Sequence, residues 1–372
     1  MKISRVDVFK LNIELTVPAV VPIGILDAAT NVIIRLETDT GLKGWGEASP
    51  FAPITGDTQE SNFLKARPMG ELLLGKDPLP TAQRMDELTS LTRGEPSLRS
   101  AFDMALYDLL GQATGLPLFR LLGGERRTLI TDRTIGLKVS VEETVRAVQE
   151  ILDLGFTEVK LKVGRPHLED VEHVKAVRQL AGPDLVIRID SNQGWDYPTA
   201  LASLRAMSGL NIQYSEQPLP AADYEGLRRL KKNSTIPICA DESLFTARDA
   251  LKLVCDDGVD YLNIKLGKSG GIGMALEIEA IARAAGRKCM LGCFAETRLG
   301  LTAAAHLACA RQNIAFLDLD SAYMLCSDPV LGGLHYSEVT AGLIHLTDDP
   351  GLGATIAEDQ LRKGEHYTLQ ES

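Results

Sequence analysis

The chain contains 372 residues, of which 45% are hydrophobic and 24% are charged, as in an ordinary globular protein. Its formal net charge of -11 argues against a nucleic-acid or anionic-membrane partner, because both need an excess of basic residues. A chain of this length exceeds what one hydrophobic core usually serves, so we expect two domains. The six cysteines form no C-x-x-C pair, which favours free thiols and a cytoplasmic location.

Residues 1–125 are predicted to form an α+β domain. Alternating apolar residues indicate strands, and a repeat at three and four residues indicates a helix that ends at Gly115 before Pro117. The three clearest strands and the clearest helix are predicted within 4–13, 31–41, 42–50 and 97–115. The second and third strands should form a hairpin, because Asp39-Thr40-Gly41 is a typical turn.

Between the first two strands, residues 16–30 are predicted to form a long apolar loop, and such loops are often functional lids. Pro18, Pro22 and Gly24 interrupt its apolar run, which is too short to span a bilayer. We therefore expect a lid and no membrane partner.

From about residue 128, short strand-like runs alternate with amphipathic helical stretches. The eight runs are "TDRTIGL", "EVKLKV", "DLVIRID", "NIQYSEQ", "IPICADE", "DYLNIKLG", "RKCMLGC" and "NIAFLDLD". This alternation predicts an α/β fold with a closed parallel barrel over residues 126–320. An open doubly wound sheet would more often carry a Gly-rich phosphate turn after its first strand, and the sequence has none there.

Charged residues end strand after strand in this second region. These strand-end residues are Lys162, Asp190, Glu216, Asp241, Lys265, Asp318 and Asp320. In a parallel barrel these ends meet at one mouth, where active sites of this architecture lie. The pattern therefore predicts a cluster of ionisable groups and a catalytic or binding site.

The three consecutive acidic ends, Asp190, Glu216 and Asp241, are predicted to share one hard cation, Mg²⁺ or Mn²⁺. Lys162 and Lys265 stand on either side of them in strand order, and a neighbouring cation should lower a lysine pKa enough to make it a base. Two bases across a metal suggest proton abstraction next to a carboxylate.

Lys160 shares the strand face of Lys162 because the two residues are two positions apart, and it should lie deeper in the barrel. An exposed strand face is the ordinary fate of paired lysines, but here the other strand-end charges favour an active-site role. Lys160 would either hold down the pKa of Lys162 or contact the carboxylate of the substrate.

The segments "KLKVG", "IDSNQGW", "YSEQP", "ADES" and "NIKLGKSGG" resemble the enolase superfamily, in its muconate lactonizing enzyme-like subgroup. The resemblance implies a modified TIM barrel, (β/α)7β, under an α+β capping domain that residues 321–372 complete. It assigns the five metal and lysine roles to the same residues and makes Asn192 and Glu242 their supports. A homo-oligomer is also typical of this family.

The segment "FLDLDS" resembles the dipeptide epimerases of that subgroup, in which such an acidic pair binds the substrate's free ammonium. Asp318 and Asp320 share a face at the last strand end; their alternative role is to cap the following turn. The resemblance implies inversion of the C-terminal residue of a dipeptide at Cα. Thr134, Cys293 and Glu296 would line the site, with Glu296 as a hydrogen-bond partner of Lys265.

The predicted side-chain preference rests on the 16–30 segment. Relatives acting on L-Ala-L-Glu are expected to carry an arginine where Gly24 stands here. Beside Gly24, a pocket for apolar side chains would instead be lined by Val20, Val21, Ile23, Ile25 and Leu26, or the segment simply packs on the barrel. Asp27 is an alternative attraction for a cationic side chain.

Two rival functions stay open at this point. An N-succinylamino acid racemase or o-succinylbenzoate synthase would have the same fold, but Asp318 and Asp320 would repel such anionic substrates. A non-catalytic metal- or ligand-binding protein would not need both Lys162 and Lys265. The sequence thus favours a small dipeptide substrate.

Overall fold

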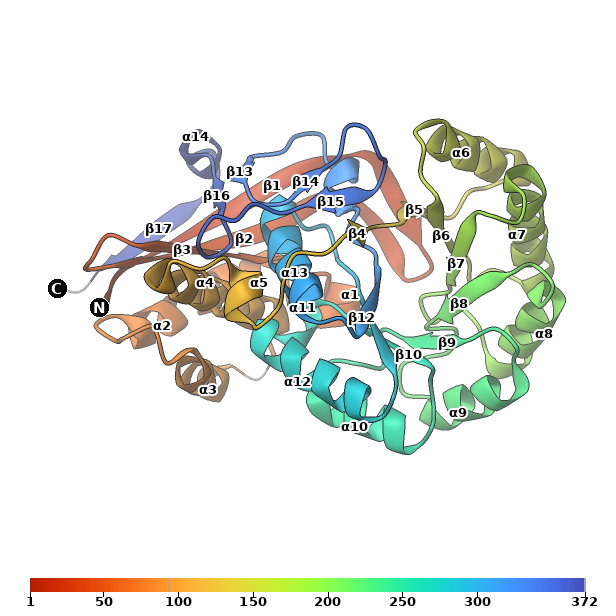
Figure 1. Cartoon of the computed structure of the whole chain (residues 1–372), viewed down its shortest axis with the longest axis horizontal. Coiled ribbons are helices and arrows are strands. Elements are labelled where there is room, and N and C mark those ends of the chain that lie inside the picture. Colours follow the sequence, from red (N-terminus) through yellow and green to blue (C-terminus); the bar gives the residue numbers. More distant parts are fainter. Residues whose placement is uncertain (93, 371–372) are drawn as a thin grey trace.

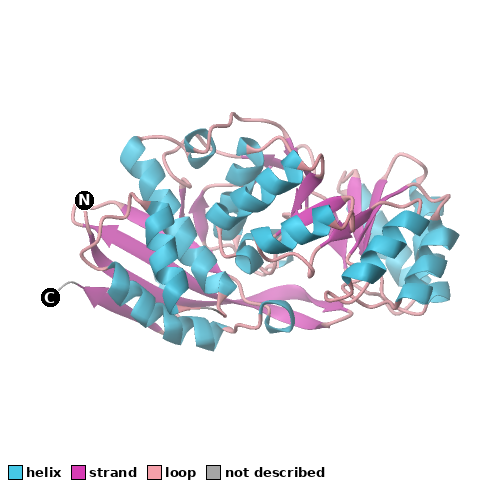
Figure 2. Ribbon diagram, turned by 90° about the horizontal axis from the view of Figure 1, so that it is seen from below, coloured by secondary structure: helices cyan, strands magenta, loops and turns pink. Residues whose placement is uncertain are grey.

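The computed structural model describes residues 1–92 and 94–370. Its first part is an antiparallel four-stranded sheet, in the order β17-β1-β2-β3, with helices packed against it (Figures 1 and 2). The strands of this capping sheet are β1 (Ile3–Val21), β2 (Gly24–Thr38), β3 (Lys43–Ala48) and β17 (His366–Gln370). The pairing of Val6 in β1 with Leu369 in β17 brings both ends of the chain into one sheet.

β1 and β2 form one long hairpin that extends from the capping sheet toward the barrel (Figure 1). The prediction of a loop at 16–30 is wrong, because its β-branched residues pair as strands up to the Val21–Gly24 pair. A register shift between Glu14 and Ala19 accommodates Pro18, which cannot donate to the ladder. The predicted turn at 39–41 is confirmed, since β2 ends at Thr38 and β3 begins at Lys43.

Helices α1 to α5 follow the hairpin in the chain, and the longest, α4, packs on β3. These helices are α1 (Ala52–Thr55), α2 (Gln59–Leu73), α3 (Thr81–Leu91), α4 (Pro96–Thr114) and α5 (Leu118–Leu121). α4 confirms the helix predicted at 97–115, and Gly115 ends it in the left-handed conformation. β3 and α4 approach so closely that a Cβ at Gly46 would lie 1.8 Å from the carbonyl oxygen of Ala101.

The second part is a sheet of eight parallel strands in the order β12-β11-β10-β9-β8-β7-β6-β5. The strands are β5 (Arg133–Ile135), β6 (Glu158–Lys162), β7 (Val186–Asp190), β8 (Ile212–Glu216), β9 (Ile238–Ala240), β10 (Tyr261–Ile264), β11 (Lys288–Leu291) and β12 (Ile314–Leu317). Their connecting helices are α6 (Val141–Asp153), α7 (His167–Ala181), α8 (Tyr197–Met207), α9 (Tyr224–Asn233), α10 (Ala247–Cys255), α11 (Leu266–Ser269), α12 (Ile272–Ala284) and α13 (Arg298–Ala310). With seven helical connections, the predicted (β/α)7β architecture is confirmed.

The strand ladder does not run all the way round the barrel. Between β5 and β12 the seam carries a backbone hydrogen bond from Asp132 N to Leu317 O, at 3.3 Å. The buried guanidinium of Arg188, on β7, crosses the interior to the same place and donates to Asp132 Oδ2 at 2.7 Å and to Leu317 O at 3.0 Å. A side chain in the lumen thus helps to hold the first and last strands together.

After β12 the chain forms the 3-10 helix η1 (Ser321–Met324) and returns along the capping sheet. Its remaining elements are β13 (Val330–Gly332), β14 (His335–Tyr336), β15 (Leu343–His345), β16 (Ala354–Ile356) and α14 (Glu358–Leu361), with β15 paired to β4 (Leu129–Ile130). The predicted division of the chain into a capping domain (1–125 with 321–372) and a barrel domain (126–320) stays a prediction. In the described part of the chain, none of the helices has the length and apolar character of a membrane-spanning segment.

Candidate active site

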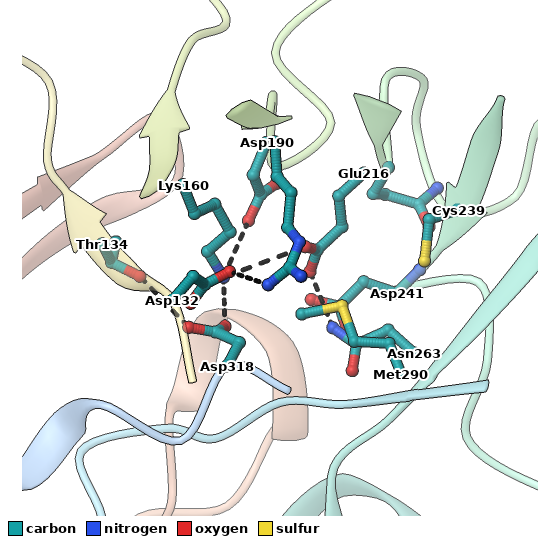
Figure 3. A network of polar contacts seen from close by, with 12 residues as sticks. Asp132, Thr134, Lys160, Asp190, Glu216, Cys239, Asp241, Asn263, Met290 and Asp318 are labelled. Carbon is teal, nitrogen blue, oxygen red and sulfur yellow. Dashed lines mark hydrogen bonds and ion pairs between the residues drawn. The ribbon is translucent and has the colours of Figure 1, made fainter. Parts of the chain in front are cut away.

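The strand-end charges lie at one mouth of the barrel, as their spacing predicts. Lys162, Asp190 and Glu216 are the last residues of β6, β7 and β8. Asp241 and Lys265 come directly after β9 and β10, and Asp318 comes directly after β12. Parallel strands bring these carboxyl ends to the same edge, and Figure 3 shows Asp190, Glu216 and Asp318 around the ammonium group of Lys160.

The three consecutive carboxylates are fully buried, at 0% exposure each. Asp190 Oδ2 accepts a hydrogen bond from Lys162 Nζ at 2.6 Å, and Glu216 Oε1 accepts one from Asn263 Nδ2 at 2.7 Å. Burial, followed by repulsion from Asp190, raises the pKa of Glu216 to about 8. Three carboxylates are thus packed together at a cost that a cation would remove.

These carboxylates suit a hard divalent cation in chemistry. Glu216 Oε2 is buried and has no hydrogen-bond partner, so one acceptor is left over. Among the described residues, no three His, Cys, Asp or Glu side chains are grouped closely enough to hold an ion. Lys162 and Lys265 donate to oxygens of Asp190 and Asp241. The carboxylate oxygens fit a divalent cation, and Lys162 and Lys265 would have to move away from the oxygens of Asp190 and Asp241 when the ion binds.

The two predicted bases reach the mouth from opposite flanks of the carboxylates. Lys162 Nζ donates to Asp190 Oδ2 and to Asn192 Oδ1, the latter at 2.9 Å. Lys265 Nζ donates to Asp241 Oδ2 at 2.7 Å and lies 4.9 Å from the centre of the Phe294 ring. Both lysines line the same cavity, which is the geometry that a two-base reaction needs.

The pKa of Lys265 differs from the sequence-based expectation. Burial acts to lower this pKa, but the neighbouring Asp241 and Glu216 carboxylates outweigh burial and raise it above the ordinary lysine value. The expectation assumed a neighbouring divalent cation. Lys265 is therefore held protonated by the carboxylates that the cation would bind.

Lys160 lies deeper than Lys162, as predicted, and is 2% exposed. Its ammonium group forms an ion pair with Asp318 and lies 3.9 Å from Asp190 Oδ2 and 3.8 Å from Glu216 Oε2 (Figure 3). It also lines the cavity. Lys160 therefore links the metal-type carboxylates to the predicted ammonium site.

Sequence reasoning missed Lys268, which is 1% exposed. Its Nζ donates to Asp241 Oδ1, to the carbonyl oxygen of Asp241 and to the carbonyl oxygen of Asn263. The only signal was its place three residues after Lys265, in a short helix. Asp241 thus has two lysine partners, and they lower its pKa although burial acts to raise it.

Asn192 and Glu242, predicted as supports of the metal and lysine residues, lie beside Lys162. Asn192 Nδ2 donates to Glu242 Oε1 at 3.0 Å while its Oδ1 accepts from Lys162. Asn192 adopts a positive φ of 39°, a conformation that asparagine tolerates better than most residues. The pair orients the ammonium group of Lys162 toward the mouth.

The predicted ammonium site, Asp318 and Asp320, lies beside Thr134. Asp318 Oδ1 accepts from Thr134 Oγ1 at 3.1 Å, and Asp320 Oδ2 accepts from Thr134 N at 2.7 Å. Both aspartates are buried, and both line the cavity. Neither side chain caps η1, so the alternative role as a turn cap is not observed.

The cavity has a polar floor on the barrel and an apolar wall on the capping side. Its apolar lining residues include Leu15, Ala19, Val21, Ile23, Leu26, Phe51, Ile54, Phe294, Met324 and Leu325. Gly24 and Ile25 are not among the lining residues. Ile25 and Val20 pair on the opposite face of the hairpin, where they are 67% and 38% exposed, so the prediction that these two residues line the pocket is wrong.

Gly24 pairs with Val21, a lining residue, and so faces the cavity without a side chain of its own. A Cβ at Gly24 would lie 3.9 Å from Phe51 Cζ, in ordinary van der Waals contact. A larger side chain at this position would therefore enter the cavity at its apolar wall.

Cys293 and Glu296 follow β11, and only Cys293 lines the cavity. Glu296 Oε1 accepts from Phe294 N at 3.2 Å, whereas Lys265 donates to Asp241, so the predicted bond between Glu296 and Lys265 is not formed. Burial, followed by repulsion from Glu47, raises the pKa of Glu296 to about 8. Glu296 belongs to the contact between barrel and cap.

The fold and the charged residues at the barrel mouth together define an enzyme-type barrel of the (β/α)7β class. Two opposed lysines flank its acidic strand ends, and a capping sheet covers them. Residues 3–123 match the family described as "Mandelate racemase / muconate lactonizing enzyme, N-terminal domain", and residues 143–360 match "Enolase C-terminal domain-like". The chain belongs to this mandelate racemase/muconate lactonizing enzyme family of the enolase superfamily, as its motifs predict.

The chain is similar along nearly its whole length to characterised epimerases. It is 39% identical to a hydrophobic dipeptide epimerase of Enterococcus faecalis, over 95% of this chain and 99% of that one. A dipeptide epimerase from Cytophaga hutchinsonii, solved with Mg and D-Ala-L-Val, superposes with a TM-score of 0.97 and 36% identity over 100% of both chains. An N-succinyl-L-Arg/Lys racemase of Bacillus cereus is more distant, at 30% identity over 98% of both chains.

Proposed function

We propose that this chain is a Mg²⁺-dependent dipeptide epimerase that inverts the C-terminal residue at Cα by a two-base 1,1-proton transfer. One arrangement carries the proposal: Lys162 and Lys265 face one cavity that also holds the Asp318–Asp320 pair. The site is thus basic where a Cα proton would be exchanged and acidic where a substrate ammonium would lie. The similar epimerases support the same reaction.

In this mechanism the aspartate pair binds the ammonium of the dipeptide, and Lys160 contacts its carboxylate. Lys162 or Lys265 removes the Cα proton from one face, and the other lysine delivers a proton to the opposite face. Asn192 keeps Lys162 oriented, and the apolar wall of the cap excludes water.

Asp190, Glu216 and Asp241 would hold the metal ion. When bound, Mg²⁺ supplies positive charge that neutralises the substrate carboxylate and makes the adjacent Cα–H more acidic. We propose that Mn²⁺ substitutes for it, because both ions prefer oxygen ligands in octahedral geometry.

The proposed substrates are dipeptides with apolar side chains. Hairpin residues Val21, Ile23 and Leu26 and the Phe51 ring form a wall without charge, and Gly24 supplies no cation that would hold a glutamate side chain. Asp27, the alternative attraction for a cationic side chain, is exposed and does not line the cavity. The similarity to a hydrophobic dipeptide epimerase supports the same preference.

The N-succinylamino acid racemase reaction is the second candidate, since a more distant relative carries that name. The buried Asp318 and Asp320 would repel a succinyl carboxylate, which makes this candidate weaker. A purely ligand-binding role leaves the opposed lysines without a purpose.

We also propose that the protein is cytoplasmic and forms a homo-oligomer. Light scattering on the purified protein would test the oligomeric state.

The test is deuterium exchange. Purified protein with Mg²⁺ in D₂O, incubated with a library of L,L-dipeptides, should add one deuteron to the C-terminal residue of apolar members. A chelator should abolish the gain, and added Mg²⁺ or Mn²⁺ should restore it. Exchange in N-succinylamino acids with none in any dipeptide would refute the proposal.

A further inference from the structure

Arg133, on β5, holds the ammonium site from outside the cavity. Its neighbour Thr134 lines the cavity, and Arg133 is not among the lining residues. Its Nη1 donates to Asp320 Oδ2 at 3.2 Å and to Asp320 O at 3.4 Å, and Nη2 donates to Tyr323 O at 3.4 Å. The guanidinium carbon lies 5.2 Å from the centre of the Tyr323 ring. Four contacts therefore fix this side chain.

The surroundings explain why a cation is needed there. Asp132, Asp318 and Asp320 are all buried at this end of the barrel. Lys160 pairs with Asp318, and Arg188 pairs with Asp132. Asp320 depends on the guanidinium of Arg133, because its other partner is the neutral backbone N–H of Thr134.

The effect of Arg133 on the pKa of Asp320 agrees with this geometry. Burial, followed by the charge of Asp318, raises the pKa of Asp320, and Arg133 acts in the opposite sense. The other titratable groups near Asp320 are Lys160, the Asp132 carboxylate, the Cys293 thiol and the phenols of Tyr323 and Tyr336. Neither phenol carries a charge near neutral pH.

We propose that Arg133 is a positioning residue for the substrate's ammonium group: it holds Asp320 as a charged, fixed ligand without touching the substrate. The inference rests on the proposed function and deepens it. Because Arg133 also fastens Tyr323, it holds η1, which carries the cavity residue Met324, against the barrel. The residue therefore acts on substrate binding and not on proton transfer.

The test compares Arg133→Gln and Arg133→Lys with a matched control, Arg127→Gln. Arg127 donates to the carbonyl oxygens of Ala308 and Ile314, at 3.0 and 2.6 Å, and lies away from the substrate cavity. Its loss should affect stability alone. KM is the chosen readout because it does not depend on the fraction of enzyme that is folded.

For an apolar dipeptide, Arg133→Gln should raise KM by about tenfold and change kcat by less than about threefold, because Asp320 loses the charged partner that holds it in place. Arg133→Lys should recover part of the KM. As a competitive inhibitor, the N-acetylated dipeptide, which lacks the ammonium, should lose less affinity in Arg133→Gln than the dipeptide substrate does.

An unchanged or lower KM in Arg133→Gln, or the same rise in Arg127→Gln, would overturn the role of Arg133 and leave the epimerase proposal intact. Absence of dipeptide turnover by the wild-type protein would instead overturn the proposed function, and the role of Arg133 with it. The two failures are thus distinguishable in one set of assays.

Discussion

Lys162 and Lys265 project from β6 and β10, and the strands between them, β7, β8 and β9, lead to the three buried carboxylates. This order places the lysines on opposite flanks of the proposed metal site. A proton removed on one flank cannot be returned by the same lysine with inversion. The two lysines should therefore be selective for opposite configurations at Cα.

Lys162→Ala and Lys265→Ala should each reduce epimerisation by at least about a hundredfold, because each removes one acid/base group. Each variant should still exchange the Cα proton of one epimer with D₂O, and the two variants should retain opposite epimers. Mass spectrometry with separately prepared L,L and L,D substrates measures this. Lys288→Ala, at the far end of β11, is the matched control and should behave as wild type. Loss of the same epimer in both lysine variants would contradict the two-base scheme.

At the scale of elements, the β1–β2 hairpin is the element that we propose to set the side-chain selectivity of the site. Its two faces are distinct: Gly24 faces the cavity wall at Phe51, whereas the adjacent Ile25 is exposed. The strand alternation offers a matched pair of variants, one residue apart and on opposite faces.

Gly24→Arg should lower kcat/KM for an apolar dipeptide by about tenfold or more, since it places a cation at an apolar wall, and should raise it for L-Ala-L-Glu. Ile25→Arg should leave both values within about threefold of wild type, because its side chain points away from the cavity. Steady-state kinetics with both dipeptides measures the contrast. Equal effects of the two variants would show that the hairpin acts through its overall charge and not through the cavity.

Sequence reasoning reached the elements whose patterns are local and missed those that depend on tertiary contacts. Lys162, Asp190 and Glu216 were predictable because apolar runs end in a charge in strand after strand. The hairpin was not, because its prolines mimic a loop and its strands are held by pairing across residues 16–30. The contact of Arg133 with Asp320 could not be predicted either, because the two residues are 187 positions apart in the sequence and only the fold brings them together.

At the scale of the whole molecule, carboxylates of the capping part bind the ends of barrel helices. Glu47, on β3, accepts hydrogen bonds from the backbone N–H groups of Thr297 and Gly300 at the start of α13, at 2.9 and 2.8 Å. Asp103, on α4, accepts from Ile272 N and Gly273 N at the start of α12. These contacts hold the cap in register with the strand ends that it covers.

Asp103 makes the stability of this contact depend on pH. Burial raises its pKa to about 7, although the two backbone N–H groups act to lower it. The folded protein then holds this proton more tightly than the unfolded chain does. The contribution of Asp103 to stability is therefore present below about pH 4 and is lost as pH rises toward 7, by up to about 1.4 kcal/mol per pH unit.

Asp103→Asn should remove this loss, because one oxygen, Oδ2, accepts both hydrogen bonds and an amide oxygen can replace it. Urea unfolding should show the variant more stable than wild type at pH 8, where the wild type buries an ionised carboxylate, and this difference should shrink as the pH falls toward 4. Asp359→Asn, at an exposed position, is the control and should shift neither midpoint. A variant that is less stable than wild type at pH 8 would mean that the charge of Asp103 itself holds α12 against the cap, through the helix dipole, and that burial costs less than this attraction supplies.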